Sequence, residues 1–375
     1  MKITMIELSH VSIPLAKPYR LSKVYGTVRE AQAVIALVHT DQGIIGFGEA
    51  DPLPPFTDES AGGVMAVIRD CLGPALLNED PTRISFLWKK MEGAIHGNPM
   101  AKGALDTALY DILGKQLDVP VYTLLGGSFR SRIEVLWPLG SGSPQEDTEQ
   151  IEEKLNEGYR TFMLKMGALP IPEEVERIRA VRERFGSEIH LMVDVNQGWR
   201  VEEALEFASA LGGYRLDFIE QPVARRDLKG LGRIRERSGF AVSADESLVT
   251  PSDAVELIEQ EAVDIFSVKV SKNGGISQAR KIALLAEVSG IRCLVNSMLE
   301  FGISQAAALH LGAAMPNLLD CGHCYMSTLR MADDITDFSA HVKDATAVPP
   351  DSPGLGVHVD SEKVEKYRRG YLKIS

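Results

Sequence analysis

The chain has 375 residues, of which 45% are hydrophobic and 6% aromatic, so it can bury a large core and is not a disordered or fibrous protein. Lys and Arg number 40 against 52 Asp and Glu, and the formal net charge of −12 disfavours nucleic acid and anionic membranes as partners. No signal-type segment or span of roughly 20 apolar residues is present, and four cysteines are too few for a disulfide scaffold, so we expect a cytoplasmic protein with reduced thiols.

The first 47 residues alternate apolar and polar positions, as in KITMIELSHVSI and AQAVIALVHT, with the turn DQG at 41–43. This period of two predicts a meander of antiparallel strands. A helix follows, because apolar residues recur every three or four positions from Ala101 to Ile112, and Gly114 with Pro120 marks its end. We therefore assign residues 1–127 to an α+β domain.

From residue 130 onward, short apolar runs alternate with amphipathic helices. The runs are VLWP, FMLK, LMVD, DFIE, VSAD, FSVK, CLVN and NLLD, and they end at Pro138, Lys165, Asp194, Glu220, Asp245, Lys269, Asn296 and Asp320. Successive ends are 24 to 29 residues apart. Eight βα units of this length predict a parallel barrel over residues 128–345, whose active site would lie at the C-terminal ends of the strands.

Five consecutive predicted strands end in a charged residue, in the order Lys165, Asp194, Glu220, Asp245 and Lys269. A barrel would bring all five side chains to one mouth. Three carboxylates held together repel one another, and an all-oxygen ligand set favours Mg²⁺, or alternatively Mn²⁺, over zinc. Each charge taken alone could simply end a strand or pair with a neighbour, but five in register favour a site.

The two lysines would flank the metal from opposite sides of the ring. This arrangement suits proton transfer on two faces of one carbon, with Mg²⁺ stabilising the enediolate that forms when a carboxylate loses its α-proton. On this interpretation Lys165 is buried so that its amine is neutral enough to act as a base.

The motifs VDVNQGW, FIEQP, ADES and KVSKNGG, together with GALDTALYDILGKQLDVPVYTLLGG, resemble the muconate lactonizing enzyme subgroup of the enolase superfamily over nearly the whole chain. The resemblance implies an α/β fold: a modified TIM barrel, (β/α)7β, with an N-terminal α+β capping domain to which residues 346–375 return. It also implies that Asp194, Glu220 and Asp245 bind the metal and that Lys165 and Lys269 are the acid/base pair. Three further residues are expected to support them: Asn196, Glu246 and Lys272.

The chain departs from the subgroup at one position, because members usually carry Lys-x-Lys on the second strand and this chain has Met163 before Lys165. A second cation there would lower the pKa of the catalytic lysine. In this chain, burial and the metal would have to lower the pKa of Lys165 without such a cation. Members without this helper lysine include some that resemble epimerases of proline betaines.

Substrate contacts are expected from the loops of the first domain and from the last two strands. The candidates are Tyr19, Tyr25, Phe56, Asn296, Met298, Glu300, Asp320 and His323. Epimerases of the subgroup carry an acidic D-x-D motif on strand eight that holds the substrate ammonium, whereas this chain has only Asp320, followed by Cys321. The single acid Asp320 is compatible with an amine-bearing substrate. The alternative interpretation of the loop candidates Tyr19, Tyr25 and Phe56 is that they are stray aromatic residues on ordinary surface loops.

The sequence CGHC at 321–324 has the letters of a thioredoxin-like redox motif. Its context argues against that function, because such a motif should open a helix in a small βαβ fold. Soft-metal binding lacks an evident fourth ligand. A buried histidine between two inert thiols is the favoured interpretation.

These patterns predict a metal-dependent enzyme that racemises or epimerises an amino-acid derivative: an N-substituted amino acid, a proline or a dipeptide. Cycloisomerisation or dehydration would share the same first half-reaction, and a binding protein without activity is the alternative from another class. The expected partner is a small carboxylate, and we expect a homo-oligomer without nucleic-acid or membrane partners.

Overall fold

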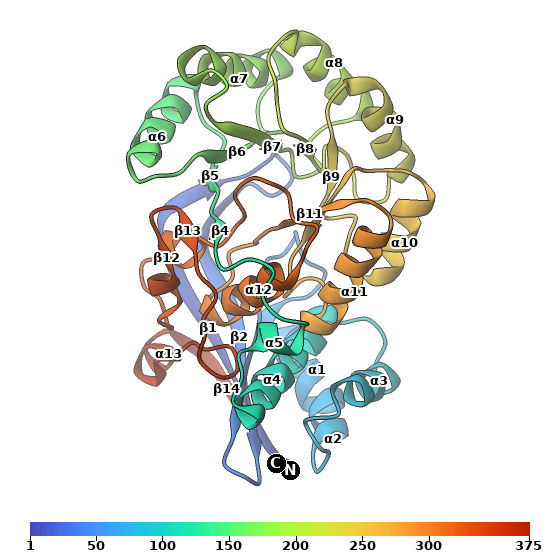
Figure 1. The fold of residues 1–375 in the computed structure, drawn as a ribbon, viewed down its shortest axis with the longest axis vertical. Helices are drawn as coiled ribbons and strands as arrows, with labels where there is room; N and C mark the ends of the chain where they lie inside the picture. The colour runs from blue at the N-terminus through green and yellow to red at the C-terminus, as the bar shows by residue number, and fades with distance from the viewer.

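The computed structural model describes residues 1–375 and shows an antiparallel sheet domain below a barrel (Figure 1). The sheet has the strand order β14-β1-β2-β3. Its strands are β1 (Ile3–Arg20), β2 (Thr27–Thr40), β3 (Ile45–Ala50) and β14 (Arg368–Ile374). The predicted meander is therefore confirmed, and the C-terminal strand completes it by pairing with β1, which brings the two chain ends together.

One face of this sheet is covered by helices, of which α4 packs most tightly. The helices of this domain are α1 (Ala61–Val67), α2 (Gly73–Leu76), α3 (Ile84–Ala94), α4 (Pro99–Leu117) and α5 (Val121–Leu124), with a π-helical turn at Ile68–Leu72. A Cβ atom on Gly48 of β3 would lie 1.8 Å from the carbonyl oxygen of Ala104 in α4. Glycine is thus required there because the helix backbone lies directly on the strand.

Seven parallel strands form the barrel sheet, in the order β11-β10-β9-β8-β7-β6-β5. They are β5 (Trp137–Leu139), β6 (Thr161–Lys165), β7 (His190–Asp194), β8 (Ile219–Glu220), β9 (Val242–Ala244), β10 (Ile265–Val268) and β11 (Arg292–Val295). Their side chains are almost all buried, as expected for a sheet covered on both faces.

An outer ring of helices surrounds these strands, with α6 to α11 following the arc of the barrel in Figure 1. They are α6 (Pro144–Asn156), α7 (Ile171–Phe185), α8 (Val201–Leu211), α9 (Leu228–Ser238), α10 (Pro251–Glu259), α11 (Gly275–Val288) and α12 (Gly302–Ala314). Capping boxes mark the N-termini of two of these helices: Ser143 and Glu146 form one before α6, and Thr250 and Asp253 form one before α10. A short α13 (Ser361–Tyr367) precedes β14.

The eighth barrel position differs from the sequence prediction, which placed a strand ending at Asp320. The chain makes only isolated parallel bridges there, Leu318 with Cys293 and His323 with Val135. Backbone hydrogen bonds from Cys324 to Val295 and from Leu136 to His323 nonetheless close the ring. The segment bulges between the two bridges, so it reaches the mouth several residues later than predicted. A small sheet of β4 (Ile133–Glu134), β12 (Val342–Lys343) and β13 (Thr346–Ala347) lies beside it.

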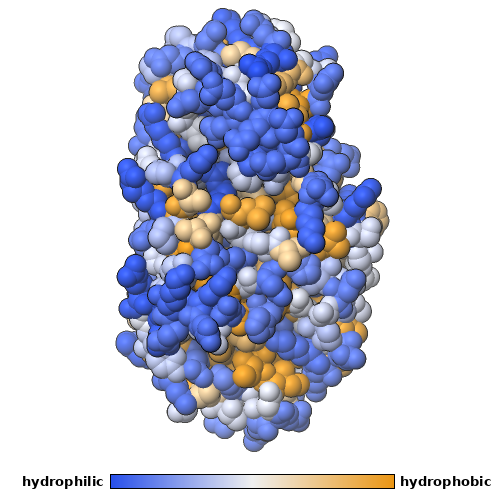
Figure 2. All heavy atoms as spheres, turned by 90° about the vertical axis from the view of Figure 1, so that its left-hand side faces the viewer, coloured by the Kyte–Doolittle hydropathy of each residue, from blue (hydrophilic) through white to orange (hydrophobic).

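The molecular surface is mainly hydrophilic on the face shown in Figure 2, with a band of hydrophobic residues at mid-height. This agrees with the excess of acidic side chains in the sequence. None of the helices combines the length and apolar character needed to cross a lipid bilayer.

Candidate active site

The five charged residues predicted at the strand ends do meet at one mouth of the barrel. Lys165, Asp194 and Glu220 are the last residues of β6, β7 and β8, and the strand register places them side by side. Asp245 and Lys269 directly follow β9 and β10. Neighbouring parallel strands therefore carry all five groups to one edge of the sheet, as a barrel requires.

The three acids form a compact oxygen cluster. Asp194, Glu220 and Asp245 have no exposed surface, and each offers a carboxylate oxygen within 4.8 Å of the others. Oε2 of Glu220 is buried and has no hydrogen-bond partner. Burial, followed by the charges of Asp194 and Asp245, raises the pKa of Glu220 well above its ordinary value. An orphaned oxygen among repelling carboxylates fits a hard divalent cation, which these three residues could hold.

Both candidate catalytic lysines contact this cluster from its two sides. Lys165 donates a hydrogen bond to Oδ2 of Asp194, and Nζ of Lys269 lies 2.5 Å from Oδ2 of Asp245. Burial lowers the pKa of each lysine, but the adjacent carboxylates outweigh it and hold both pKa values above the ordinary one. Burial by itself therefore does not keep Lys165 neutral without a cation, and the expectation that burial and the metal together lower its pKa stays a prediction. A metal on the same carboxylates would oppose that ion pairing and favour the neutral amine.

The three residues predicted to support the cluster lie next to it. Asn196 donates to Oδ2 of Asp194 at 3.0 Å and to Oε1 of Glu246 at 3.4 Å. Lys272 lies 2.6 Å from Oδ1 of Asp245, whereas Lys269 contacts Oδ2 of the same carboxylate. Burial raises the pKa of Glu246 to about 8, with the charge of Asp245 adding to the effect.

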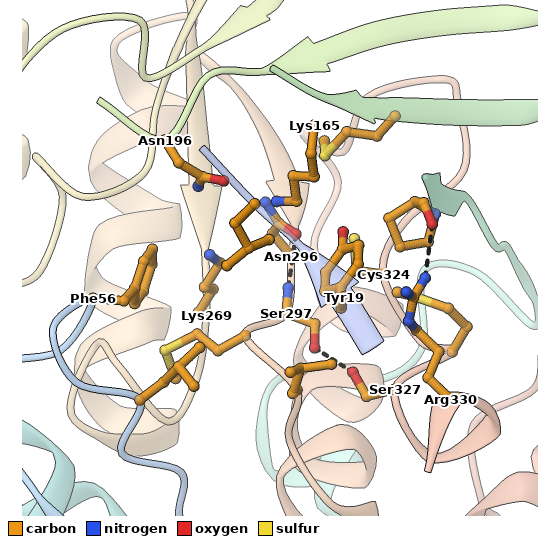
Figure 3. A pocket seen from close by; sticks show the side chains of 17 residues that line it. Tyr19, Phe56, Lys165, Asn196, Lys269, Asn296, Ser297, Cys324, Ser327 and Arg330 are labelled. Carbon is orange, nitrogen blue, oxygen red and sulfur yellow. Dashed lines mark hydrogen bonds between the residues drawn. The ribbon is translucent and has the colours of Figure 1, made fainter. Parts of the chain in front are cut away.

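A cavity opens above the cluster. Lys165 and Lys269 point into it from different strands, with Phe56 on one side and Tyr19 with Arg330 on the other (Figure 3). Nζ of Lys269 lies 4.6 Å from the centre of the Phe56 ring, so the aromatic loop of the first domain covers this lysine.

Four of the predicted substrate contacts line the cavity, namely Tyr19, Phe56, Asn296 and Met298. Asn296 also donates to Oε1 of Glu220 at 2.8 Å, which orients that carboxylate. Tyr25 and Glu300 do not line the cavity but contact residues that do. Tyr25 packs edge-on against Phe56, and the Glu300 carboxylate accepts hydrogen bonds from the backbone N–H groups of Met298 and Leu299.

The other two predicted contacts, Asp320 and His323, do not reach the cavity. Asp320 is exposed and pairs with Arg292, which begins β11 at the opposite end of the barrel. His323 is buried, accepts a hydrogen bond from the Val295 N–H and contacts the Leu319 carbonyl, and burial lowers its pKa to about 4. Both predictions followed from ending the eighth strand too early.

Sequence reasoning missed several residues of the wall, among them Cys324, Ser327 and Arg330. Cys324 occupies the strand-eight position at the mouth, and burial raises the pKa of its thiol above the ordinary range. Counting on from the predicted strand end would have found Cys324, whereas no sequence signal marks Arg330. The CGHC stretch contributes only this thiol to the cavity, and all four cysteines are free.

Two family models match the chain. The model described as "Mandelate racemase / muconate lactonizing enzyme, N-terminal domain" covers residues 3–126, and "Enolase C-terminal domain-like" covers residues 146–364. The chain belongs to the mandelate racemase/muconate lactonizing enzyme family of the enolase superfamily. It is an enzyme of that superfamily, whose members depend on a divalent metal.

Relatives in this family catalyse different reactions. An N-succinyl-L-Arg/Lys racemase from Bacillus cereus is 34% identical, with 98% of each chain covered. Its crystal structure superimposes with a TM-score of 0.96 at 33% identity, covering 100% of both chains. The L-Ala-D/L-Glu epimerase of Bacillus subtilis is 33% identical over 95% of this chain and 97% of its own. A chloromuconate cycloisomerase from Pseudomonas putida is also 33% identical, over 98% of this chain and 100% of its own. Similarity alone therefore does not name the reaction of this family member.

Proposed function

We propose that this enzyme removes and returns the α-proton of an N-acylated amino acid, and so racemises or epimerises it. The observation that carries the proposal is the placement of two lysines on opposite sides of one carboxylate cluster, on β6 and just after β10. Strands β7 to β9 separate them in the sheet. A carbon held above the cluster would present one face to each amine, which is the requirement for inversion.

Each group has a distinct part in the proposed reaction. Asp194, Glu220 and Asp245 would hold a divalent ion, for which we propose Mg²⁺, with Mn²⁺ as the alternative. The ion would stabilise the negative charge that develops on the substrate carboxylate as the α-proton leaves. Lys165 or Lys269, depending on the enantiomer, accepts that proton, and the opposite lysine, protonated, donates one to the other face.

The N-acyl form of the substrate is favoured by what the cavity wall lacks. No aspartate or glutamate lines the cavity, so no carboxylate of the wall would pair with a free α-ammonium group. The predicted acid for that purpose, Asp320, is exposed at the other end of the barrel. The N-succinyl racemase among the relatives supports the same substrate class.

The proposal is tested by incubating the protein with Mg²⁺ in D₂O and a set of N-acetyl and N-succinyl amino acids of both configurations. Deuterium at the α-carbon together with inverted configuration, read by NMR and chiral chromatography, is the expected result. Loss of water would identify a dehydratase instead. No exchange with any N-acyl amino acid, combined with lactonisation of cis,cis-muconate, would replace the proposal by cycloisomerisation.

A further inference from the structure

A buried ion-pair cluster that the proposed reaction does not use lies behind the end of β6. Arg177 of α7 has no exposed surface and pairs with two equally buried acids. Its Nε lies 2.7 Å from Oδ2 of Asp147, and its Nη1 lies 2.9 Å from Oε2 of Glu174. The cost of removing such charges from water offsets much or all of the free energy gained by pairing them. Stability alone therefore does not account for these three charges.

This cluster contacts the backbone of Lys165. Nη1 of Arg177 donates a hydrogen bond to the carbonyl oxygen of Lys165 at 2.8 Å, and the hydroxyl of Ser141 donates to the same oxygen at 3.0 Å. Oε1 of Glu174 accepts hydrogen bonds from both N–H groups of residues 168–169, at 3.2 and 3.1 Å, in the loop that follows. Side chains of α7 and of the loop after β5 thus hold the end of the strand that carries the lysine.

A different side chain holds the backbone of Lys269. Oδ1 of the buried Asn273 accepts a hydrogen bond from the Lys269 N–H at 2.7 Å, and the Asn273 N–H donates to the Lys269 carbonyl at 2.8 Å. Nδ2 of Asn273 donates to the carbonyl oxygens of Leu248 and Val249, at 2.9 and 3.0 Å, which ties the lysine to the loop after β9. The two lysines therefore have separate supports.

These supports lie where the strand pairing ends. On one side of β6, pairing with β5 reaches only Leu164, and the pairing of β10 with β11 ends at Val268. The ladders therefore hold Lys165 on one side only and do not include Lys269. Lysine has a flexible stem of four carbons, so a small change at its backbone becomes a larger displacement at Nζ. A misplacement of about 1 Å at a reacting group can lower a rate about 10²-fold.

We propose that Arg177 and Asn273 are positioning residues, each for one of the two proton transfers: Arg177 positions Lys165, and Asn273 positions Lys269. This inference rests on the proposed function in that the two lysines act on opposite faces of the substrate. Neither Arg177 nor Asn273 lines the cavity, so each acts through the backbone of its lysine. Substitutions that leave both lysines in place should therefore weaken proton transfer on one face at a time.

The test measures α-proton exchange in D₂O with Mg²⁺ for each enantiomer of N-acetyl and N-succinyl amino acids, because net inversion needs both lysines and cannot separate them. Arg177→Lys keeps a positive charge but lacks the fork that reaches both acids and the carbonyl. It should lower exchange about 10²-fold from the enantiomer that Lys165→Ala affects, and Asn273→Ala should do so from the other enantiomer. Arg184→Lys, at an exposed arginine of α7, should leave both rates unchanged. Equal losses from both enantiomers, or no loss from either, overturn the inference.

A second measurement does not depend on catalysis. The protein is labelled with ¹³C at Cε of lysine, and the NMR signals of the two lysines are assigned with Lys165→Arg and Lys269→Arg. Arg177→Lys should shift the Lys165 signal and leave the Lys269 signal in place, and Asn273→Ala should do the opposite. Selective shifts without any exchange in the wild type retain the positioning and reject the proposed function. Wild-type exchange that both variants keep, with both signals unmoved, retains the function and rejects the positioning.

Ser141→Ala keeps the inference testable if Arg177→Lys does not fold. It removes the other side-chain donor to the Lys165 carbonyl without leaving a buried charge unpaired. Exchange from the enantiomer that depends on Lys165 should fall about 2- to 10-fold, since a single hydrogen bond contributes on that order, and exchange from the other enantiomer should not change. An equal loss from both enantiomers, or no loss, contradicts the role assigned to the carbonyl contacts.

Discussion

At the scale of single residues, two opposing effects act on the pKa values of Lys165 and Lys269, and the sequence does not show which of them is larger. Burial favours the neutral amine, and the adjacent carboxylates favour the ammonium. In the absence of a cation, the effect of the carboxylates on the lysine pKa values is larger than that of burial. The protonation state of each lysine therefore depends on whether the cluster is occupied, which links base strength to metal binding.

Replacing either lysine should remove proton transfer on one face of the substrate. We expect Lys165→Ala and Lys269→Ala each to lose exchange from one enantiomer by about 10²- to 10⁴-fold, because positioned general bases contribute on that order. Exchange is measured by NMR in D₂O for each enantiomer separately. Lys229→Ala, at an exposed lysine of α9, serves as the control. Equal exchange from both enantiomers in Lys269→Ala would remove that lysine from the mechanism.

At the scale of elements, β3 of the first domain and helix α12 of the barrel share a buried acidic contact. Glu49 of β3 accepts hydrogen bonds from the N–H groups of Phe301 and Ile303 at the start of α12, at 2.8 and 3.2 Å. Oδ2 of Asp51 accepts from the Ser304 hydroxyl at 2.8 Å. Carboxylates at a helix N-terminus satisfy donors that the helix itself leaves free. The contact joins the two domains beside the loop that carries Met298.

This contact predicts a stability that falls as pH rises. Burial raises the pKa of Asp51 from 3.8 to about 7, helped by the charge of Glu300. The folded protein thus keeps a proton that the unfolded chain releases, so this contribution is present below about pH 4 and is lost by about pH 7. The free energy of unfolding of the wild type minus that of Asp51→Asn should decrease by up to about 4 kcal/mol over this window. Urea titrations at several pH values measure it, and a constant difference would contradict the prediction.

At the scale of the whole molecule, folding gathers three acids onto adjacent strands that span residues 190–245 in the sequence. Their mutual repulsion opposes folding, and a ligand that binds only the folded arrangement stabilises it. The cluster exists only when the barrel is formed. Metal binding should therefore be visible in global stability, without knowledge of the substrate.

Millimolar Mg²⁺ should raise the melting temperature of the protein. At a concentration of about 100 times Kd the stabilisation is about 2.7 kcal/mol. Glu220→Gln should lose this effect, because Oε2 of Glu220 is the orphaned oxygen of the cluster, whereas Glu259→Gln, at an exposed glutamate of α10, should keep it. Differential scanning calorimetry provides the readout. An unchanged melting temperature in the wild type with either Mg²⁺ or Mn²⁺ would argue strongly against a metal site.

The strand-end chemistry could be predicted from local sequence. The apolar runs that end in charged residues predict both the barrel and the location of its polar groups, because parallel strands in a closed sheet end at one edge. These residues are Lys165, Asp194, Glu220, Asp245 and Lys269. The helices around them also follow from local signals such as the capping box at Ser143. The domain boundaries and the homo-oligomer remain predictions.

Only the tertiary structure decided which residues form the cavity wall. The bulge between Leu318 and His323 moves Asp320 out to Arg292 and brings Cys324 to the mouth, and strand periodicity cannot foresee an irregular strand. Arg330 reaches the cavity because it stacks on Tyr19, a residue more than 300 positions away in the sequence. The sequence by itself thus determined the family, the fold and the charged cluster, which depend on local patterns. The walls that select the substrate depend on contacts between distant segments, which only the folded chain specifies.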